Sequence, residues 1–402
     1  MASKSRAAET AALMLCVMFF GTLNNFLGRM KAKVFDTYNF VSGITDNWLH
    51  LVINLLAIWL LMRAGSVTKE QLRYVFKFGC SWKENGIWKY IAVASVNDVA
   101  NLVTGLAAQP YLTALMMSMM DQATTPFTVV CSFLMLGTRY SALETTCVVV
   151  LVAAAISGVL AAQASNSGDN SPFWAAFAAL TTAFAAVSFV LKETAFREYS
   201  AYRSSSAATD DQYVEIGPVR HAPAPVPGPA ILEPEAPLAA PRPGQPELPE
   251  TLSVFLVGAI VSVGGCLMSV PVVLINRWLT ADGSPTQALV DGFACMFNCE
   301  HALMTYFFYT INNFIYNFCL LALTSRGSAL LAFLSLKLVV PLTAVCSSIP
   351  WPLIGAKTVG SVQWLILIVM LVALGGFRYG NVVRERLISE GRKHGCCYPL
   401  CG

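Results

Sequence analysis

The chain has 402 residues, of which 56% are hydrophobic and only 12% are charged, and its mean hydropathy is +0.59. This composition indicates an integral membrane protein and excludes an ordinary soluble domain. The formal net charge of +3 is small, and no basic cluster is interleaved with aromatic residues. We therefore exclude nucleic-acid binding and expect the lipid bilayer to be the main environment of the chain.

Apolar stretches long enough to cross a bilayer predict an all-α protein with ten transmembrane helices. The first stretch could pass for a signal peptide, but it is long and no small-residue cleavage site follows it, so we expect a retained first helix. Short tails at 1–9 and 381–402 flank the spans. The ten spans are predicted at 10–28, 47–63, 87–108, 112–137, 141–163, 172–192, 251–275, 302–324, 327–349 and 360–378.

A proline-rich segment at 196–250 separates the first transmembrane half, at 10–195 with helices one to six, from the second half at 251–380 with helices seven to ten. It holds eleven of the chain's twenty prolines. A segment of this composition does not bury a core, so the sequence predicts a disordered linker.

One stretch of the sequence occurs twice. Pro126–Ser132 reads Pro-Phe-Thr-Val-Val-Cys-Ser and recurs as Pro-Leu-Thr-Ala-Val-Cys-Ser at Pro341–Ser347, and the same displacement carries Asn97-Asp98 onto Asn312-Asn313. We predict two five-helix repeats, and because five is odd the repeats have opposite orientations in the membrane. Inverted repeats with polar or proline-interrupted helices at matching places are typical of a transporter's midplane site. A duplicated bundle kept for packing alone is the alternative.

The distribution of lysine and arginine predicts the orientation. Twenty of these residues fall on the side of both termini and five on the opposite side. Because cytosolic loops carry the excess of positive charge, we expect both termini and the linker in the cytosol and a lumenal loop at 276–301.

Cysteines lie on both predicted sides of the membrane. Cys295 and Cys299 share the lumenal loop, and four residues apart on a helix they approach closely enough for a disulfide after modest adjustment; two free thiols are the alternative. The cytosolic tail carries Cys396, Cys397 and Cys401, which suit reversible palmitoylation or an unmodified disordered tail equally well.

Three charged residues fall within predicted spans: Asp98, Asp121 and Lys337. A charge at the bilayer centre costs about 2.5–3.5 kcal/mol on insertion scales, so such residues usually mark a pathway for substrate or protons. A buried ion pair or a protonated acid that only fixes helix packing is the alternative for each of them.

The two repeats place a long polar side chain four residues before a proline. Gln122 precedes Pro126, and Lys337 precedes Pro341. A proline inside a helix frees the carbonyl one turn earlier, so both prolines are candidate hinges.

A second layer of polar residues consists of asparagines in spans one, three and eight. Their plain role is interhelical hydrogen bonding, worth about 0.6 kcal/mol each. We favour the other role, the lining of a wet cavity. They are Asn24, Asn25, Asn97, Asn101, Asn312, Asn313 and Asn317. The sequence shows no catalytic or metal-ligand spacing, which argues against an enzyme, a metal or a cofactor.

Several segments resemble the chloroquine-resistance transporter (CRT-like) family of the drug/metabolite transporter superfamily. The most specific is Asp291-Gly292-Phe293-Ala294-Cys295-Met296-Phe297, which is similar to the family's loop motif after the seventh helix. Residues 24–41, Asp98, Gln122 with Pro126, and Arg378-Tyr379-Gly380-Asn381 are similar too. The resemblance covers nearly the whole chain except the linker and the tails.

This resemblance implies a ten-helix, inverted-repeat carrier whose central cavity is lined by helices 1–4 and 6–9. Family members move amino acids, peptides, cationic drugs or glutathione across vacuolar, lysosome-like or plastid membranes. The chain departs from the parasite proteins at Asn25, where the drug-sensitive form has lysine, at Asp121, which replaces an apolar residue, and at Lys337, which has no clear counterpart. The resemblance therefore supports the architecture more firmly than the substrate.

Together these features predict a secondary transporter of small cationic or zwitterionic solutes that works by alternating access in an organelle membrane and is coupled to protons. Asp98, Asp121 and Lys337 give the cavity a formal charge of −1, which disfavours phosphates. We hypothesise that Lys337 holds Asp98 ionised in one conformation and that Asp98 takes a proton or a cationic solute in the other.

Two alternative functions stay open at this point. A nucleotide-sugar or sugar-phosphate carrier would share the architecture but would need more cavity cations. A non-transporting receptor or scaffold would act through the proline-rich linker. Substrate identity and oligomeric state are left open by these patterns.

Overall fold

The computed structural model describes residues 2–81, 84–108, 120–165, 172–212, 251–280, 284–326, 329–346, 349–353 and 361–389. In these residues the regular structure is helical, with twelve α-helices and two short 3₁₀ helices, which confirms the predicted all-helical class. The elements are α1 (Ala2–Phe35), η1 (Asp36–Tyr38), α2 (Asn39–Arg63), α3 (Lys69–Val75), α4 (Trp88–Ala108), η3 (Asp121–Ala123), α6 (Thr124–Leu136), α7 (Ala142–Ser165), α8 (Pro172–Gln212), α9 (Val254–Thr280), α10 (Pro285–Asn298), α11 (Ala302–Arg326), α12 (Ala329–Cys346) and α13 (Ser361–Ser389).

Within the described ranges, four stretches of helix are long and apolar enough to cross a membrane. They are Ala8–Phe35, Asn39–Arg63, Phe173–Ser204 and Trp364–Arg384. Large apolar side chains cover the outside of the bundle; Leu134 and Leu267 are each 71% exposed. Such side chains suit contact with lipid rather than water, so the fold is that of a multi-pass membrane protein.

Several element boundaries differ from those expected. Helix α2 begins at Asn39 rather than at 47, and α13 continues past 380 to Ser389. The predicted lumenal loop at 276–301 contains the end of α9 and the whole of α10. Periodic burial continues beyond the apolar windows, and helices continue with it.

Helix α8 runs on to Gln212, although a linker was predicted from 196. Phe196 and Tyr199 are buried in a cluster with Val75 of α3, and Tyr202 stacks on Tyr74 with ring centroids 3.7 Å apart. This packing stabilises extra helical turns that the apolar pattern did not indicate. Residues 213–250, the rest of the predicted linker, lie outside the described residues.

The fourth predicted span, 112–137, is not one helix in the part that the structure describes. The 3₁₀ turn η3 precedes α6, and residues 109–119 lie outside the described residues. Helix α6 ends at Gly137, whose φ of 63° is left-handed and suits glycine. Helix α7 begins with a capping box, in which the Ser141 N–H donates to Glu144 Oε2 at 2.6 Å and the Glu144 N–H to Ser141 Oγ at 3.2 Å.

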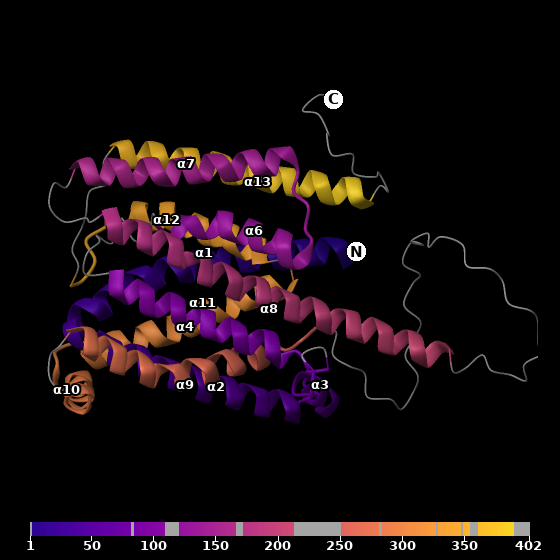
Figure 1. Ribbon diagram of the computed structural model, residues 1–402, viewed down its shortest axis with the longest axis horizontal. Helices are drawn as coiled ribbons and strands as arrows, with labels where there is room; N and C mark the ends of the chain where they lie inside the picture. Colours follow the sequence, from indigo (N-terminus) through magenta and orange to yellow (C-terminus); the bar gives the residue numbers. More distant parts are fainter. Residues whose placement is uncertain are drawn as a thin grey trace, which may run out of the picture.

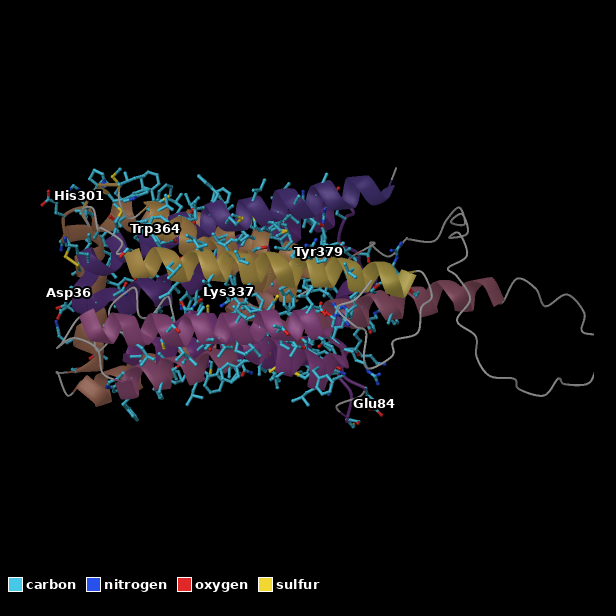
Figure 2. The ribbon with its side chains drawn as sticks, turned by 90° about the horizontal axis from the view of Figure 1, so that it is seen from above. Asp36, Glu84, His301, Lys337, Trp364 and Tyr379 are labelled. Carbon is cyan, nitrogen blue, oxygen red and sulfur yellow. A yellow bond between two sulfur atoms is a disulfide. The ribbon has the colours of Figure 1, made fainter. Side chains whose placement is uncertain are left out.

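The long helices lie side by side along one axis (Figure 1). The start of α1, the end of α13, the short α3 and the extended end of α8 lie at one end, which we call the terminal end. Helix α10 lies across the bundle at the opposite end, the α10 end. Figure 2 shows Asp36 and His301 at the α10 end, Glu84 and Tyr379 toward the terminal end, and Lys337 between them.

Helix contacts connect distant segments of the chain, both within the first half and between the two halves. Helix α1 packs on α11 and α12, α8 packs on α4 and α6, α2 packs on α9, and α7 packs on α13. Helix α4 also packs along α9, where a Cβ on Gly264 would lie only 2.0 Å from Ser95 Oγ, so glycine permits the close approach. Helices α2 and α11, by contrast, meet at only a few positions.

Candidate functional site

Asp98 of α4 forms an ion pair inside the bundle, with Lys192 of α8. The Lys192 ammonium donates to Asp98 Oδ2 at 2.6 Å, and the two side chains are 7% and 29% exposed. A buried ammonium requires a counter-charge, and Asp98 supplies it. In this structure Asp98 is therefore held by Lys192, whereas the sequence suggested Lys337 as its partner.

Lys337 of α12 is buried and lies beside Asp121 instead. Its ammonium donates to the backbone carbonyl of Asp121 at 2.6 Å and is attracted by the Asp121 carboxylate. The Asp121 side chain is exposed, and its charge interacts electrostatically with Tyr316 of α11. Two of the three predicted charged residues thus meet, one from each repeat. The Gln122 side chain lies outside the described part of the chain.

The two candidate hinge prolines have different local geometry. Pro341 lies inside α12, where it interrupts the helix hydrogen bonds. Pro126 lies in the first turn of α6, where a missing N–H leaves no internal bond unmade. Of the two prolines, Pro341 has the geometry of a hinge in this conformation.

The asparagines of α1 and α11 meet in the polar interior. Asn312 Nδ2 donates to the Phe20 carbonyl at 3.0 Å and to Asn24 Oδ1 at 3.4 Å. Asn25 Nδ2 donates to Thr343 Oγ1 of α12 at 3.2 Å. Asn317 Nδ2 bonds Asn313 in its own helix, at 2.8 Å to the carbonyl and 3.0 Å to Oδ1.

The asparagines of α4 are not brought into these contacts. Asn97 Nδ2 donates to the Val93 carbonyl of its own helix at 2.8 Å, and Asn101 is half-buried. The five other predicted asparagines therefore form the interhelical network, while those of α4 flank Asp98.

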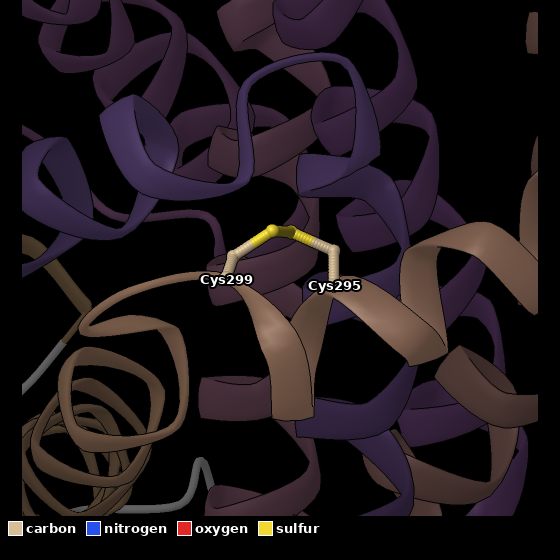
Figure 3. Close-up of a disulfide and its surroundings, with 2 residues drawn as sticks. All are labelled: Cys295 and Cys299. Atoms are coloured by element: carbon tan, nitrogen blue, oxygen red, sulfur yellow. A yellow bond between two sulfur atoms is a disulfide. The ribbon is translucent and has the colours of Figure 1, made fainter.

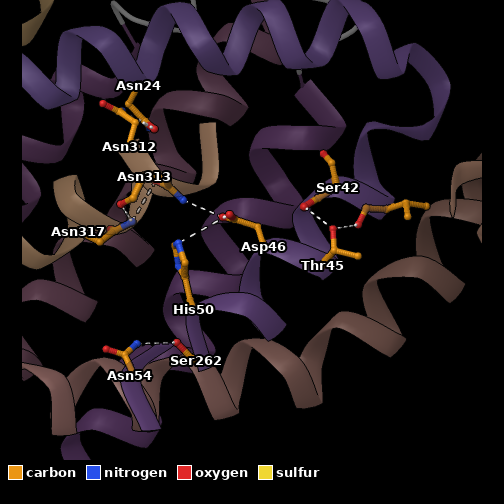
Figure 4. A network of polar contacts seen from close by, with 11 residues as sticks. Asn24, Ser42, Thr45, Asp46, His50, Asn54, Ser262, Asn312, Asn313 and Asn317 are labelled. Atoms are coloured by element: carbon orange, nitrogen blue, oxygen red, sulfur yellow. Dashed lines mark hydrogen bonds and ion pairs between the residues drawn. The ribbon is translucent and has the colours of Figure 1, made fainter. Parts of the chain in front are cut away.

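A cluster on α2 was missed by the sequence analysis: Asp46, His50 and Asn54, each four residues after the last (Figure 4). Asp46 Oδ1 lies 3.7 Å from His50 Nε2, and Asp46 Oδ2 accepts from Asn313 Nδ2 at 2.7 Å. Asn54 Nδ2 lies 3.5 Å from Ser262 Oγ of α9. The spacing was visible in the sequence, but a span predicted to begin at 47 hid it.

Charged groups also join helices at the terminal end. Glu193 of α8 accepts the Ala329 N–H at the start of α12 at 2.8 Å and pairs with Arg197. Arg326 of α11 pairs with Glu9 of α1. A carboxylate at a helix N-terminus satisfies its unbonded N–H groups and complements its dipole, so Glu193 fastens α12 to α8.

A disulfide joins Cys295 and Cys299 at the α10 end (Figure 3). Cys295 is buried and Cys299 is exposed just after α10 ends. The link ties the last turn of α10 to the chain that enters α11. Nearby, the Lys31 ammonium of α1 lies 3.9 Å from the centroid of the Tyr309 ring.

These helices and their polar interior define a membrane protein with charged groups buried among its spans. The model of the CRT-like (chloroquine-resistance transporter-like) family matches residues 11–204. The chain is 21% identical to Crt homolog 1 of Dictyostelium discoideum over 95% of this chain and 77% of that protein. It is 24% identical to Crt homolog 3 of the same organism over 95% of this chain and 75% of that protein. The family prediction is therefore confirmed: residues 11–204 match the CRT-like family, which implies a membrane transporter.

Proposed function

We propose that the protein is a secondary transporter that moves small cationic or zwitterionic solutes across an organelle membrane by alternating access, coupled to protons. The observation that carries this proposal is a set of acid–base pairs inside a CRT-like helical bundle. The pairs are Asp98–Lys192, Asp121–Lys337 and Asp46–His50. Charges at such depth are costly to keep unless they serve a pathway.

The pairing of charges favours a dipolar solute. Each carboxylate in this set has a basic group beside it, so the ammonium and the carboxylate of a zwitterion have complementary partners to exchange with. Amino acids, peptides and glutathione-like thiols are zwitterions of this kind. A phosphate carrier would need cations without acidic neighbours, and Lys192 and Lys337 each have one. Asp121 is accessible although protein surrounds it, which suits a group that faces an internal space.

We further propose ten spans arranged as two inverted repeats, with the two predicted halves joined by a linker that follows Gln212. The packing supports this proposal. In the proposed repeat α8 is the counterpart of α1 and α11 is the counterpart of α4, so the contact of α4 with α8 corresponds to the contact of α11 with α1. Helix α12 is likewise the counterpart of α6, so the contact of α6 with α8 corresponds to the contact of α12 with α1. Thr343, which bonds Asn25, corresponds to Thr128 in the repeat.

One contact breaks the repeat symmetry. In the proposed repeat α9 is the counterpart of α2 and α4 is the counterpart of α11, so the contact of α2 with α11 should resemble that of α9 with α4. Helix α4 packs along α9, however, whereas α2 and α11 meet at only a few positions. Alternating access requires two repeats in different conformations at any moment. We infer that the α2–α11 seam is the parted gate and that the charged contacts at the terminal end form the closed one. With both termini in the cytosol, the parted gate faces the lumen of a vacuolar, lysosome-like or plastid compartment.

Uptake into proteoliposomes tests the proposal. Purified protein is offered radiolabelled arginine, a dipeptide, glutathione or chloroquine, and in parallel UDP-glucose and a triose phosphate, with and without an acidic interior. We expect uptake of at least one cationic or zwitterionic probe, and exchange against the same compound on the other side. Uptake of the phosphorylated probes alone would favour the phosphate-carrier alternative.

A variant that lacks 213–250, the part of the predicted linker after α8, separates the scaffold alternative and leaves the buried Phe196 and Tyr199 in place. A transporter should keep its uptake without this segment, whereas a scaffold that recruits partners through it should lose its cellular function. Absence of any uptake by the full chain, together with loss of function on deletion, would refute transport.

A further inference from the structure

The pair Asp46–His50 has two buried atoms that face each other without a bond. The side chains are about nine-tenths buried, and His50 Nε2 lies 3.7 Å from Asp46 Oδ1, beyond hydrogen-bond distance. Neither atom has a hydrogen-bond partner among the described residues. The second carboxylate oxygen is held by Asn313 Nδ2 at 2.7 Å, so the carboxylate is fixed and its free oxygen points at the ring (Figure 4).

One small ligand completes this arrangement, and it is a proton. A neutral ring that presents its lone pair to a buried carboxylate leaves both atoms unsatisfied, which is unfavourable away from water. A proton on Nε2 creates a charge-assisted hydrogen bond between imidazolium and carboxylate, and a small rotation closes the gap. Histidine is also the side chain that changes charge at about pH 5 to 8, the range between an acidic lumen and the cytosol.

The helices that pack on α2 carry further titratable and polar groups. The Asp46 carboxylate attracts the Lys31 ammonium of α1, and its charge also interacts with Tyr306 and Tyr309 of α11. Helix α10 contributes Asp291, whose carboxylate accepts from Gln287 at 2.8 Å. Helix α9 contributes the Ser262 hydroxyl, through Asn54. His50 itself packs edge-on against the Phe314 ring, with centroids 5.5 Å apart.

The position of the pair suits access from one side. Asp46 and Asn313 join α2 to α11 across the seam where these helices meet at few positions. Opening or closing the seam makes or breaks this contact, so the environment of the pair changes with the gate. Asp98, by contrast, already accepts a hydrogen bond from the Lys192 ammonium at 2.6 Å, so no atom of that contact is left facing an unbonded partner.

We propose that the Asp46–His50 pair is the proton-binding site of this transporter. The proton adds to the free lone pair of the His50 ring, no other bond is broken, and the net charge of the pair rises from −1 to zero. The imidazolium then offsets the attraction of Asp46 for Lys31, so the Lys31 ammonium can bind the carboxylate of a solute instead. Proton and zwitterion are therefore bound together and cross together. This inference rests on the proposed transport function.

Histidine-selective nitrogen NMR tests proton binding without any transported solute. The chain has only four histidines, and the exposed His301 beside Glu300 is an internal control. We expect the His50 signal, identified by its loss in His50→Gln, to titrate between about pH 5 and 8. In Asp46→Asn its proton affinity should fall tenfold or more, because an opposite charge at this distance is lost, while His301 is unchanged. A His50 signal that does not titrate, or that titrates alike in both proteins, overturns the inference.

Transport of glutathione and arginine in proteoliposomes separates this inference from the proposed function. We expect uptake by His50→Gln to lose the stimulation by an acidic compartment that the wild-type protein shows. Retained stimulation in His50→Gln overturns the proton site and leaves the transporter intact. Failure of the wild-type protein in exchange itself would instead count against the proposed function, and the NMR titration would still decide whether His50 binds a proton.

Discussion

The Asp98–Lys192 pair gives a stability prediction that follows from its unequal burial. Lys192 is 7% exposed, so Asp98→Asn leaves an ammonium buried without a counter-charge, which should destabilise the fold by about 3–5 kcal/mol. Lys192→Met leaves a carboxylate that is 29% exposed and partly hydrated, so its effect should lie at the lower end of that range. The double variant removes both charges and should recover much of the loss.

A double-mutant cycle measures this coupling. Melting temperatures of the purified proteins in one detergent should rank wild type first, then the double variant, then Lys192→Met, then Asp98→Asn. Because each single substitution costs about 3–5 kcal/mol and the double variant should lose less than either, the coupling should be about 3 kcal/mol or more, at the upper end of the range for contacting residues. Glu9→Gln is the matched control, because its pair with Arg326 is half-exposed and worth at most about 1 kcal/mol. Additive effects of the two substitutions would refute the pair as a structural unit.

The remaining predictions concern topology, thiols and coupling. Protease added to the cytosolic side of sealed organelles should cut within 196–250 and leave two embedded halves; protection until detergent is added would reverse the orientation. Mass spectrometry of unreduced protein should find Cys295 linked to Cys299, and free alkylation of both thiols would contradict this. The hydrogen-bonded thiols of Cys16 on α1 and Cys319 on α11 should crosslink under mild oxidation in a protein without its other cysteines, and no crosslink would contradict the α1–α11 packing. If Asp98 is not the proton acceptor, the Asp98→Asn/Lys192→Met double variant should retain acid-stimulated uptake, which His50→Gln loses.

Much of the architecture could be predicted from the sequence because it depends on local composition. Long apolar runs indicated helices, and every predicted span overlaps a helix in the described residues. The family resemblance rested on short motifs that need no tertiary information. Helix ends were less accurate, because burial against neighbours carries α2 and α8 beyond their apolar windows. Helix α13 also continues beyond its apolar window.

The partners of the buried charges could not be predicted in this way. Composition identified Asp98, Asp121 and Lys337 as costly residues, but a carboxylate bonds whichever base the packing brings near it. Because α4 packs on α8, Asp98 accepts a hydrogen bond from Lys192. Because Lys337 of α12 lies beside η3, it donates to the carbonyl of Asp121.

The sequence by itself thus determined a helical membrane protein with an internal repeat and charges within its spans, because hydrophobic runs and repeated motifs are properties of the linear chain. The tertiary structure alone decided which charges neutralise each other, that Asp46 and His50 face each other unbonded, and that the α2–α11 seam is the looser of two related contacts. Hydrogen bonds and ion pairs act over a few ångströms between residues far apart in the chain, so only the packed helices fix them.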